Sequence, residues 1–231
     1  MPFSLQNGMV DIYYLRTGSD MEGRIHATRF LDRDELQYYH RCSSTGRKNH
    51  FLCGRALAKS ILSGITGLPV NNICIERDPY GRLQLKDLND KFCGNHNGRI
   101  DFNLSHSGEV TACAVILDGK VGIDVESTER EIQHTVSTFF HEREIRFLMS
   151  GGNEDKKSVC RLWTMKESYV KCKGRGLAIP FDSFNVLKND EVAFKSFHIS
   201  GYCISVAVES PCENIRGNIR KMEIKDLLIT A

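Results

Sequence analysis

Two carboxylates that stand two residues apart are the first candidates for chemistry. Asp124 and Glu126 lie in the apolar run VGIDVE (121–126), which has the composition of a β-strand. Residues two apart on a strand point to the same face, so both carboxylates project together. Neighbouring carboxylates repel each other unless a cation lies between them, and Mg²⁺ prefers oxygen ligands of this kind. An exposed polar strand face has the same spacing, so this pair alone leaves both interpretations open.

A second group of candidates lies in the segment WTMKESYVK (163–171). Its apolar residues follow helical spacing and predict one buried face. Glu167 and Lys171 lie one turn apart beside that face, which fits either a solvated ion pair or a base and a cation in a site. Lys166 falls near the centre of the apolar face, so its ammonium group requires a carboxylate or phosphate partner.

The third group is FNLSHSG (102–108), in which a strand-like start is expected to run into a turn at Ser105, His106 and Ser107. Small hydroxyl groups, turn amides and an imidazole can together hold a phosphate. The alternative is an ordinary turn with a surface histidine. A nucleophile–base pair of Ser105 and His106 is disfavoured, because adjacent side chains on an extended chain diverge.

The elements that position these groups occur twice in the sequence. Helical stretches are predicted over 47–68 and 156–177, and glycines mark the end of each. Each stretch is followed by an F-x-[LI]-S segment, at 102–105 and 197–200, and then by a strand, VTACAVIL (110–117) or YCISVAVE (202–209). Chance similarity of two helix–strand units is the alternative to a duplication, and the matched helix ends and strand starts favour the duplication.

We therefore expect an α+β protein made of two similar α/β halves related by pseudo-twofold symmetry. Each half is expected to be a small antiparallel sheet packed on a long helix. Residues 1–117 would form the N-terminal half and residues 118–231 the C-terminal half that carries the acids. The active site is expected in the cleft between them, because ligands commonly bind between two such units.

Composition excludes several classes of protein. The 231 residues carry a formal net charge of only +2, so a global field that attracts nucleic acid is absent. The nine cysteines have no C-x-x-C pair or zinc spacing, and we interpret them as reduced thiols. The chain shows neither a signal peptide nor an apolar run long enough for a membrane span. We expect a cytoplasmic protein with no membrane and no nucleic-acid partner.

In their order and spacing, the three groups resemble the signature of the 4′-phosphopantetheinyl transferases. That signature comprises SHSG (105–108), GIDVE (122–126), and WTMKESYVK followed by the G-x-G-L ending at 174–177. The length and the duplication are similar to the long, pseudo-dimeric branch of the family, typified by the surfactin-type enzyme. The resemblance covers residues 30–209 and includes PYGRL (79–83), PFDSF (180–184), and the helix start at Phe140 and Glu144.

The resemblance implies a reaction and roles for the acids. The serine hydroxyl of an apo-carrier protein attacks the β-phosphate of coenzyme A, phosphopantetheine moves to the serine, and adenosine 3′,5′-bisphosphate leaves. By position, Asp124, Glu126 and Glu167 correspond to the acids that bind Mg²⁺, or Mn²⁺ in its place. Glu167 also corresponds to the base for the hydroxyl, and Lys171 to the lysine that assists the leaving group.

The coenzyme A site is implied in the same way, with departures from the family pattern. Arg82 replaces the usual lysine of the Y-G-K-P turn and Leu83 replaces its proline, while Gln37 falls where the family often has a basic residue. A basic cluster in 41–55 is expected to compensate. The candidate coenzyme A-binding residues are Lys48, Arg55, Gly81, Arg82, Ser105 and His106.

The partner is expected to be a carrier protein or domain of acyl, peptidyl or aryl type, from fatty-acid, polyketide or nonribosomal-peptide biosynthesis. A monomer is expected, because the duplication supplies both halves of the cleft. The competing hypothesis is a non-catalytic module that binds coenzyme A or a carrier protein. A degenerate module of that kind is expected to lose Asp124, Glu167 or Lys171, and this sequence keeps all three.

Overall fold

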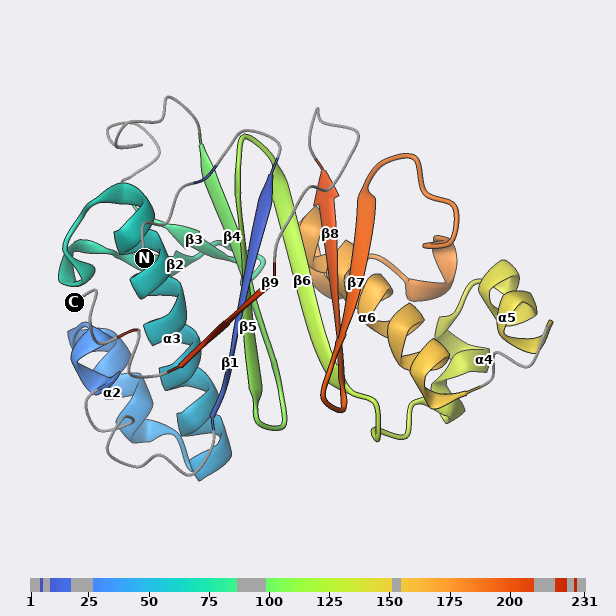
Figure 1. Ribbon diagram of the computed structural model, residues 1–231, viewed down its shortest axis with the longest axis horizontal. Coiled ribbons are helices and arrows are strands. Elements are labelled where there is room, and N and C mark those ends of the chain that lie inside the picture. The colour runs from blue at the N-terminus through green and yellow to red at the C-terminus, as the bar shows by residue number, and fades with distance from the viewer. Residues whose placement is uncertain are drawn as a thin grey trace.

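The computed structural model describes residues 5, 9–17, 27–86, 99–150, 155–209, 219–223 and 227. Within these residues the chain is an α+β protein with sheets of four, three and two strands (Figure 1). Among the described helices, none combines the length and the apolar character that a membrane span requires.

The four-stranded sheet has the order β4-β5-β1-β9. Its strands are β1 (Val10–Arg16), β4 (Ile100–Ser107), β5 (Val110–Leu117) and β9 (Ile219–Met222). β5 is antiparallel to β4 and to β1, whereas β9 runs parallel to β1. The expected purely antiparallel sheet was therefore wrong for this half, and a strand from the expected C-terminal half completes it. The four residues of β9 are too few to give a strand pattern in the sequence.

The three-stranded sheet has the order β6-β8-β7 and is antiparallel throughout, as expected. Its strands are β6 (Lys120–Ser127), β7 (Ala193–Ile199) and β8 (Tyr202–Glu209). β6 and β8 pair over their whole lengths. Because β6 stands first in the sheet order, it is an edge strand within the described residues.

All eight residues of β5 are buried because both faces of its sheet are covered. Cys113, Val115 and Leu117 pack in the same core as α3 (Thr45–Thr66). The alternate residues of β5 pack in a second core with Val121, Ile123 and the apolar residues of β8. The inner faces of the two sheets therefore meet, and each sheet carries a long helix on its outer face, α3 on one and α6 (Lys156–Lys173) on the other (Figure 1).

Both long helices are capped at each end, and their C-terminal glycines are those that the sequence predicts. The Ser44 side chain accepts a hydrogen bond at the start of α3, and the Asp155 side chain accepts two at the start of α6. Gly67 and Gly174 follow the two helices with φ values of 73° and 68°, a left-handed conformation that glycine adopts without steric cost.

The remaining elements are short and surround the two helices. They are η1 (Thr28–Phe30), α2 (Arg33–Arg41), η2 (Val70–Asn72), β2 (Ile75–Arg77), β3 (Leu83–Leu85), η3 (Gln133–Thr135), α4 (Val136–Phe139), α5 (Glu142–Met149), η4 (Gly176–Ala178) and η5 (Phe181–Ser183).

The two larger sheets are joined at their edge strands by side chains rather than by strand pairing. Asp101, Asn103 and Ser105 of β4 accept hydrogen bonds from the backbone N–H groups of residues 121, 123 and 125 of β6, at 2.8, 3.0 and 3.3 Å. An unpaired edge N–H that is buried costs free energy, so polar side chains at alternate positions of β4 stabilise this junction. The junction fixes β4 and β6 side by side in one register.

Candidate functional site

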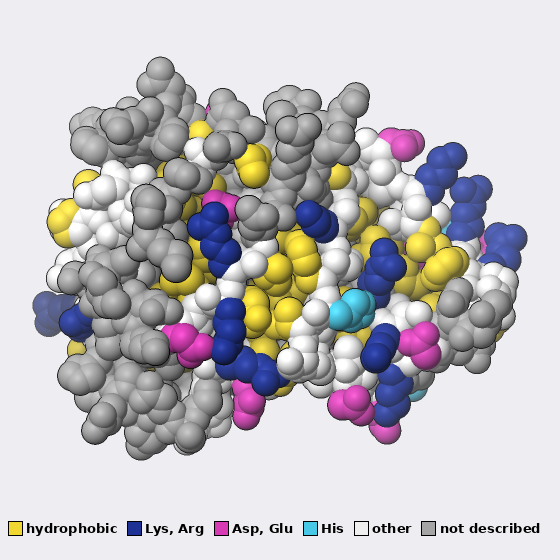
Figure 2. Space-filling model, viewed as in Figure 1, with side chains coloured by type: hydrophobic (Ala, Val, Ile, Leu, Met, Phe, Trp, Pro, Cys, Tyr) yellow, Lys and Arg dark blue, Asp and Glu magenta, His cyan; other side chains and the backbone are white. Residues whose placement is uncertain are grey.

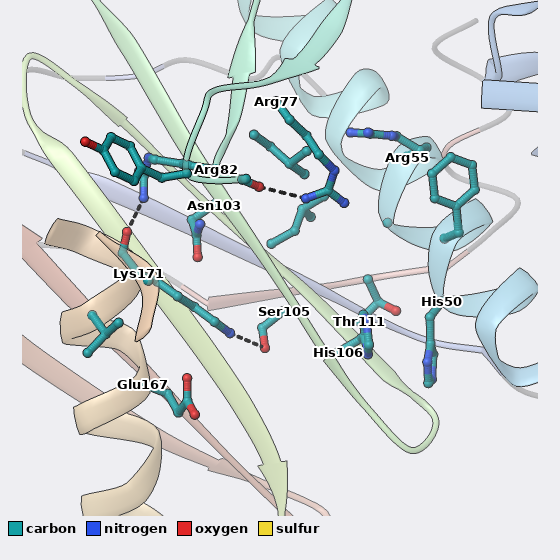
Figure 3. Close-up of a pocket in the computed structure, with 18 of the residues that line it drawn as sticks. His50, Arg55, Arg77, Arg82, Asn103, Ser105, His106, Thr111, Glu167 and Lys171 are labelled. Carbon is teal, nitrogen blue, oxygen red and sulfur yellow. Dashed lines mark hydrogen bonds between the residues drawn. The ribbon is translucent and has the colours of Figure 1, made fainter. Parts of the chain in front are cut away.

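A cavity of about 730 Å³ lies over the junction of β4 and β6. Residues of α3, α6, β4 and the β2–β3 turn line it. In Figure 3, Glu167 and Lys171 reach into it from α6, Asn103 and Ser105 lie on β4, and His50 and Arg55 come from α3. The cavity is therefore lined from both long helices, α3 and α6. On the face of the molecule shown in Figure 2, Lys and Arg side chains are interspersed with Asp and Glu, in keeping with the low net charge.

Asp124 is the buried centre of the acidic group, with 4% of its surface exposed. Its Oδ1 accepts hydrogen bonds from Lys171 Nζ at 2.6 Å and from Ser105 Oγ at 2.9 Å. Lys171 Nζ also lies 3.0 Å from Ser105 Oγ, so three predicted site residues form one cluster. Asp124 Oδ2 is buried and has no hydrogen-bond partner among the described residues. An unpartnered buried carboxylate oxygen is costly without a further cation or donor.

Glu126 lies on the same face of β6 as Asp124, as its spacing predicts, but has different partners. Ser107 Oγ donates to it at 2.7 Å, and Arg130 Nη1 donates to its other oxygen. Burial is the main cause that raises the pKa of Glu126. Arg130 was not among the predicted site residues, and its i,i+4 position relative to Glu126 is the only signal the sequence offers.

Glu167 lines the cavity from α6, one turn before Lys171. Burial and then the neighbouring Asp124 raise the pKa of Glu167, and Lys171 opposes them, so that the pKa lies at about 7. A carboxylate with a pKa near neutrality exchanges a proton readily at the pH of a cell, which suits a general base.

The described residues contain no group of three or more His, Cys, Asp or Glu side chains arranged to hold a metal ion. Lys171 and Arg130 instead supply the positive charges beside Asp124 and Glu126. The donor chemistry still fits a hard cation, because Asp124 Oδ2 is unpartnered and the pKa of Glu167 is raised by burial and then by the like charge of Asp124.

His106 lies on β4 rather than in a turn, because that strand continues to Ser107. The turn comes one residue later, at Gly108, whose φ is 53°. The His106 ring stacks on the His50 ring with centroids 4.1 Å apart, and the His50 Nε2 lies 2.8 Å from the Gly108 carbonyl oxygen. Burial, and then the neighbouring His50 and Lys171, lower the pKa of His106 to about 4. The imidazole of His106 is therefore neutral at pH 7 in the free protein.

Arg55 lines the cavity with only 6% of its surface exposed. Its Nε lies 3.0 Å from Glu35 Oε1, but the two atoms are not aligned as a hydrogen bond. Its Nη1 is buried with no partner among the described residues, so the guanidinium can still donate hydrogen bonds to a bound anion. Arg77 lines the same part of the cavity and was not predicted, because nothing in the spacing of a short exposed strand singles it out.

The structure does not bring Lys48 to the cavity. Its ammonium nitrogen lies 5.7 Å from the centroid of the Tyr39 ring, and Lys48 is absent from the residues that line the cavity. Gly81 and Arg82 do line it, at the β2–β3 turn. The guanidinium of Arg82, however, donates to Asp101 and to two backbone carbonyl groups.

The buried partner expected for Lys166 is a carboxylate. Lys166 Nζ lies 2.7 Å from Glu144 Oε2, and both side chains are fully buried, with 0% exposure. The ammonium also donates to the Phe184 carbonyl oxygen at 2.9 Å, and Glu144 accepts from the backbone N–H groups of His141 and Val186. This pair anchors α5 to α6 and lies outside the cavity.

Comparison with known proteins gives two family matches that together cover most of the chain. Residues 120–211 match the 4′-phosphopantetheinyl transferase superfamily, and residues 21–117 match the family described as 4′-phosphopantetheinyl transferase, N-terminal. Among individual proteins, the chain is 30% identical to the 4′-phosphopantetheinyl transferase gsp of Aneurinibacillus migulanus, over 78% of this chain and 73% of that protein.

Two further relatives match over a smaller share of their lengths. The 4′-phosphopantetheinyl transferase HetI of Nostoc sp. is 32% identical over 64% of this chain and 61% of its own. The 4′-phosphopantetheinyl transferase Sfp of Bacillus subtilis is 33% identical over 58% of this chain and 56% of its own. The chain thus matches less than two thirds of the length of these two proteins.

Proposed function

Because the chain belongs to the 4′-phosphopantetheinyl transferase superfamily, we propose that it transfers the 4′-phosphopantetheine moiety of coenzyme A to a serine of an apo-carrier protein. The observation that carries the proposal is a cluster in which Ser105, Glu167 and Lys171 line the cavity, while the buried Asp124 accepts hydrogen bonds from Ser105 and Lys171. It combines a base, a cation and an unpartnered carboxylate oxygen, which are the groups that phosphoryl transfer from a pyrophosphate requires.

Glu167 is the proposed base. The serine Oγ forms a bond to the β-phosphorus while the bond from that phosphorus to the bridging oxygen breaks, and Glu167 takes the hydroxyl proton. Its pKa of about 7 lets a large share of the protein hold the carboxylate form at neutral pH. Lys171 is the proposed partner of the leaving group, because its ammonium lies at the floor of the cavity beside Ser105.

Asp124 and Glu167 are the proposed direct ligands of Mg²⁺, or of Mn²⁺ in its place. Glu126, on the same face of β6 as Asp124, is proposed as the third acid of the metal site. The unpartnered Oδ2 of Asp124 supports this assignment. A bound divalent cation neutralises charge on the pyrophosphate of coenzyme A. Lys171 would then have to share Asp124 with the metal, because its ammonium lies 2.6 Å from Oδ1.

The phosphates of coenzyme A are proposed to lie between β4 and α3. Ser105 and His106 would contact them from β4, and Arg55 would contact them through its free Nη1. Gly81 borders the same cavity, and the absence of a side chain there leaves room for a close approach.

The finer organisation of the chain is also a proposal. Two units with the same order of a long helix followed by an antiparallel strand pair support two halves related by pseudo-twofold symmetry, divided near residue 117. Both sides of the cavity come from one chain, which supports a monomer. We propose a cytoplasmic enzyme that acts on an acyl, peptidyl or aryl carrier.

The proposal is tested by incubating the protein with coenzyme A, Mg²⁺ and a panel of apo-carriers, and measuring the intact mass of each carrier. The expected result is a gain of one phosphopantetheine on the carrier serine. Asp124→Ala is expected to abolish the gain while the protein remains folded, and Asp190→Ala, at an exposed aspartate, serves as the matched control. A protein that binds coenzyme A but modifies no carrier would be a binding module, and the proposal would be wrong.

A further inference from the structure

Hydrogen bonds within the β2–β3 turn hold the backbone of Arg82 in place. The Asp78 Oδ1 accepts hydrogen bonds from the backbone N–H groups of Tyr80 at 2.8 Å and Arg82 at 2.9 Å. The Gly81 N–H donates to the Asp78 carbonyl oxygen at 2.9 Å, which closes the turn. These hydrogen bonds fix the backbone position from which the Arg82 side chain starts.

The guanidinium of Arg82 binds three different elements of the fold. Its Nη2 donates to Asp101 Oδ2 of β4 at 2.6 Å and to the Val121 carbonyl oxygen of β6 at 2.8 Å. Its Nη1 donates to the Lys171 carbonyl oxygen of α6, as the dashed line in Figure 3 shows. Asp101 Oδ2 also accepts from the Val121 N–H at 2.8 Å, so the ion pair closes one end of the β4–β6 junction.

The contact with Lys171 matters because that residue is bound both at its backbone carbonyl group and at its side-chain ammonium group. Its carbonyl group lies in the last turn of α6, where the helix supplies only a 3.2 Å hydrogen bond from Gly174. A cation at a helix C-terminus is stabilising, so Arg82 suits this carbonyl. The side-chain ammonium of Lys171 binds Asp124 and Ser105. A shift of the carbonyl would therefore move the ammonium relative to both.

We infer that Arg82 is a positioning residue that fixes Lys171 and the β4–β6 junction, and that it does not contact the phosphates of coenzyme A. The inference rests on the proposed function for its kinetic test. An arginine is required because its planar fork reaches several acceptors in fixed directions, whereas a lysine ammonium is a single compact charge. Only 14% of the Arg82 side chain is exposed, in keeping with an internal role.

The test compares Arg82→Lys with Asp101→Asn. Asp101 does not line the cavity that holds Glu167, so Asp101→Asn removes no direct contact with a phosphate bound there. We expect each variant to lower kcat by about 10–100-fold, because a misplacement of ~1 Å near reacting groups costs up to about 10² in rate. The KM and Kd for coenzyme A are expected to change less than about twofold, since no ground-state contact is lost. Arg146→Lys, in an exposed ion pair with Glu142, is the matched control.

A double-mutant cycle separates this inference from the proposed function. The kcat losses, and the losses in the midpoint of urea unfolding, are expected to be non-additive, because both substitutions alter the same ion pair. A tenfold or greater rise in the Kd for coenzyme A with Arg82→Lys, with no change for Asp101→Asn, would make Arg82 a phosphate ligand and overturn the inference. If the wild-type protein modifies no carrier, the proposed function fails, and the Kd values and the unfolding cycle still decide the role of Arg82. If Arg82→Lys does not fold, the kcat and KM of Asp101→Asn decide it.

Discussion

The substitution Glu167→Gln tests the electrostatics of the site most directly, because it keeps the shape of the side chain and removes its charge. The pKa of Glu167 is raised from 4.5 to about 7, first by burial and then by Asp124. At about 1.4 kcal/mol per pKa unit, the charged form costs on the order of 3 kcal/mol in the folded, metal-free protein. The glutamine variant does not carry this cost.

The pH dependence of this effect follows from the direction of the shift. The folded protein binds the Glu167 proton more tightly than the unfolded chain, so stability decreases as the pH rises from 4.5 to about 7. Glu167→Gln is therefore expected to stabilise the protein at pH 8 and to stabilise it much less at pH 5. For a chain of this size, ~1 kcal/mol corresponds to roughly 2–4 °C in Tm, so a gain of several degrees is expected at pH 8.

The same variant is expected to lose activity. General-base assistance is typically worth about 10²–10⁴-fold, so kcat should fall by at least ~10²-fold with coenzyme A binding retained. Mg²⁺ should raise the Tm of the wild-type protein at pH 8 more than that of the variant, because the variant lacks one proposed ligand. Melting curves at pH 5 and pH 8, in chelator and in Mg²⁺, and single-turnover transfer to an apo-carrier measure these effects.

The control is Glu142→Gln, at an exposed position of α5 with a surface ion pair, where we expect a change within ~0.5 kcal/mol and an unaltered rate. A Glu167→Gln protein that modifies the carrier at the wild-type rate would refute the role of base. An equal gain in Tm at pH 5 and pH 8 would refute the electrostatic argument, since the stabilisation would then not come from the carboxylate.

The remaining predictions concern coenzyme A binding and packing. His106→Ala is expected to raise the KM for coenzyme A more than it lowers kcat, with a smaller effect on dephospho-coenzyme A, and equal effects on both substrates would remove His106 from the phosphate site. Gly122→Ala is expected to cost more than ~3 kcal/mol in urea unfolding, because its Cβ would overlap the backbone of α6, whereas Gly46→Ala has open space and should be neutral or stabilising. Lys166→Met leaves Glu144 buried without its partner and should cost about 3–5 kcal/mol, and a Tm unchanged from wild type would contradict this.

Most of the secondary structure could be predicted from the sequence because each long element has a strong local signal. The strands predicted at 110–117 and 202–209 match β5 and β8 residue for residue. The helices predicted over 47–68 and 156–177 lie at α3 and α6, and Gly67 and Gly174 mark their ends. The parallel pairing of β9 could not be predicted, because it depends on an open edge of β1 that appears only after the sheet forms.

Part of the site could also be predicted, because some of its features have local signals in the sequence. The shared face of Asp124 and Glu126 and the carboxylate partner of Lys166 follow from periodicity and burial, which are local properties. The expected turn at His106 was wrong because pairing with β5 extends β4 through Ser107. The stacking of His106 on His50 comes from tertiary packing, which no local spacing reports.

The spacing between the serine and acid groups has a physical origin in the β4–β6 junction. Ser105 donates to Asp124 at 2.9 Å and Ser107 donates to Glu126 at 2.7 Å, so two pairs with the same sequence separation of 19 residues lie in one register. Alternate residues of β4 also accept the N–H groups of β6, so a slip by one residue would leave those N–H groups unpaired and set an apolar residue opposite Ser105. The register that satisfies the backbone of the edge strand is therefore the register that assembles the acidic cluster.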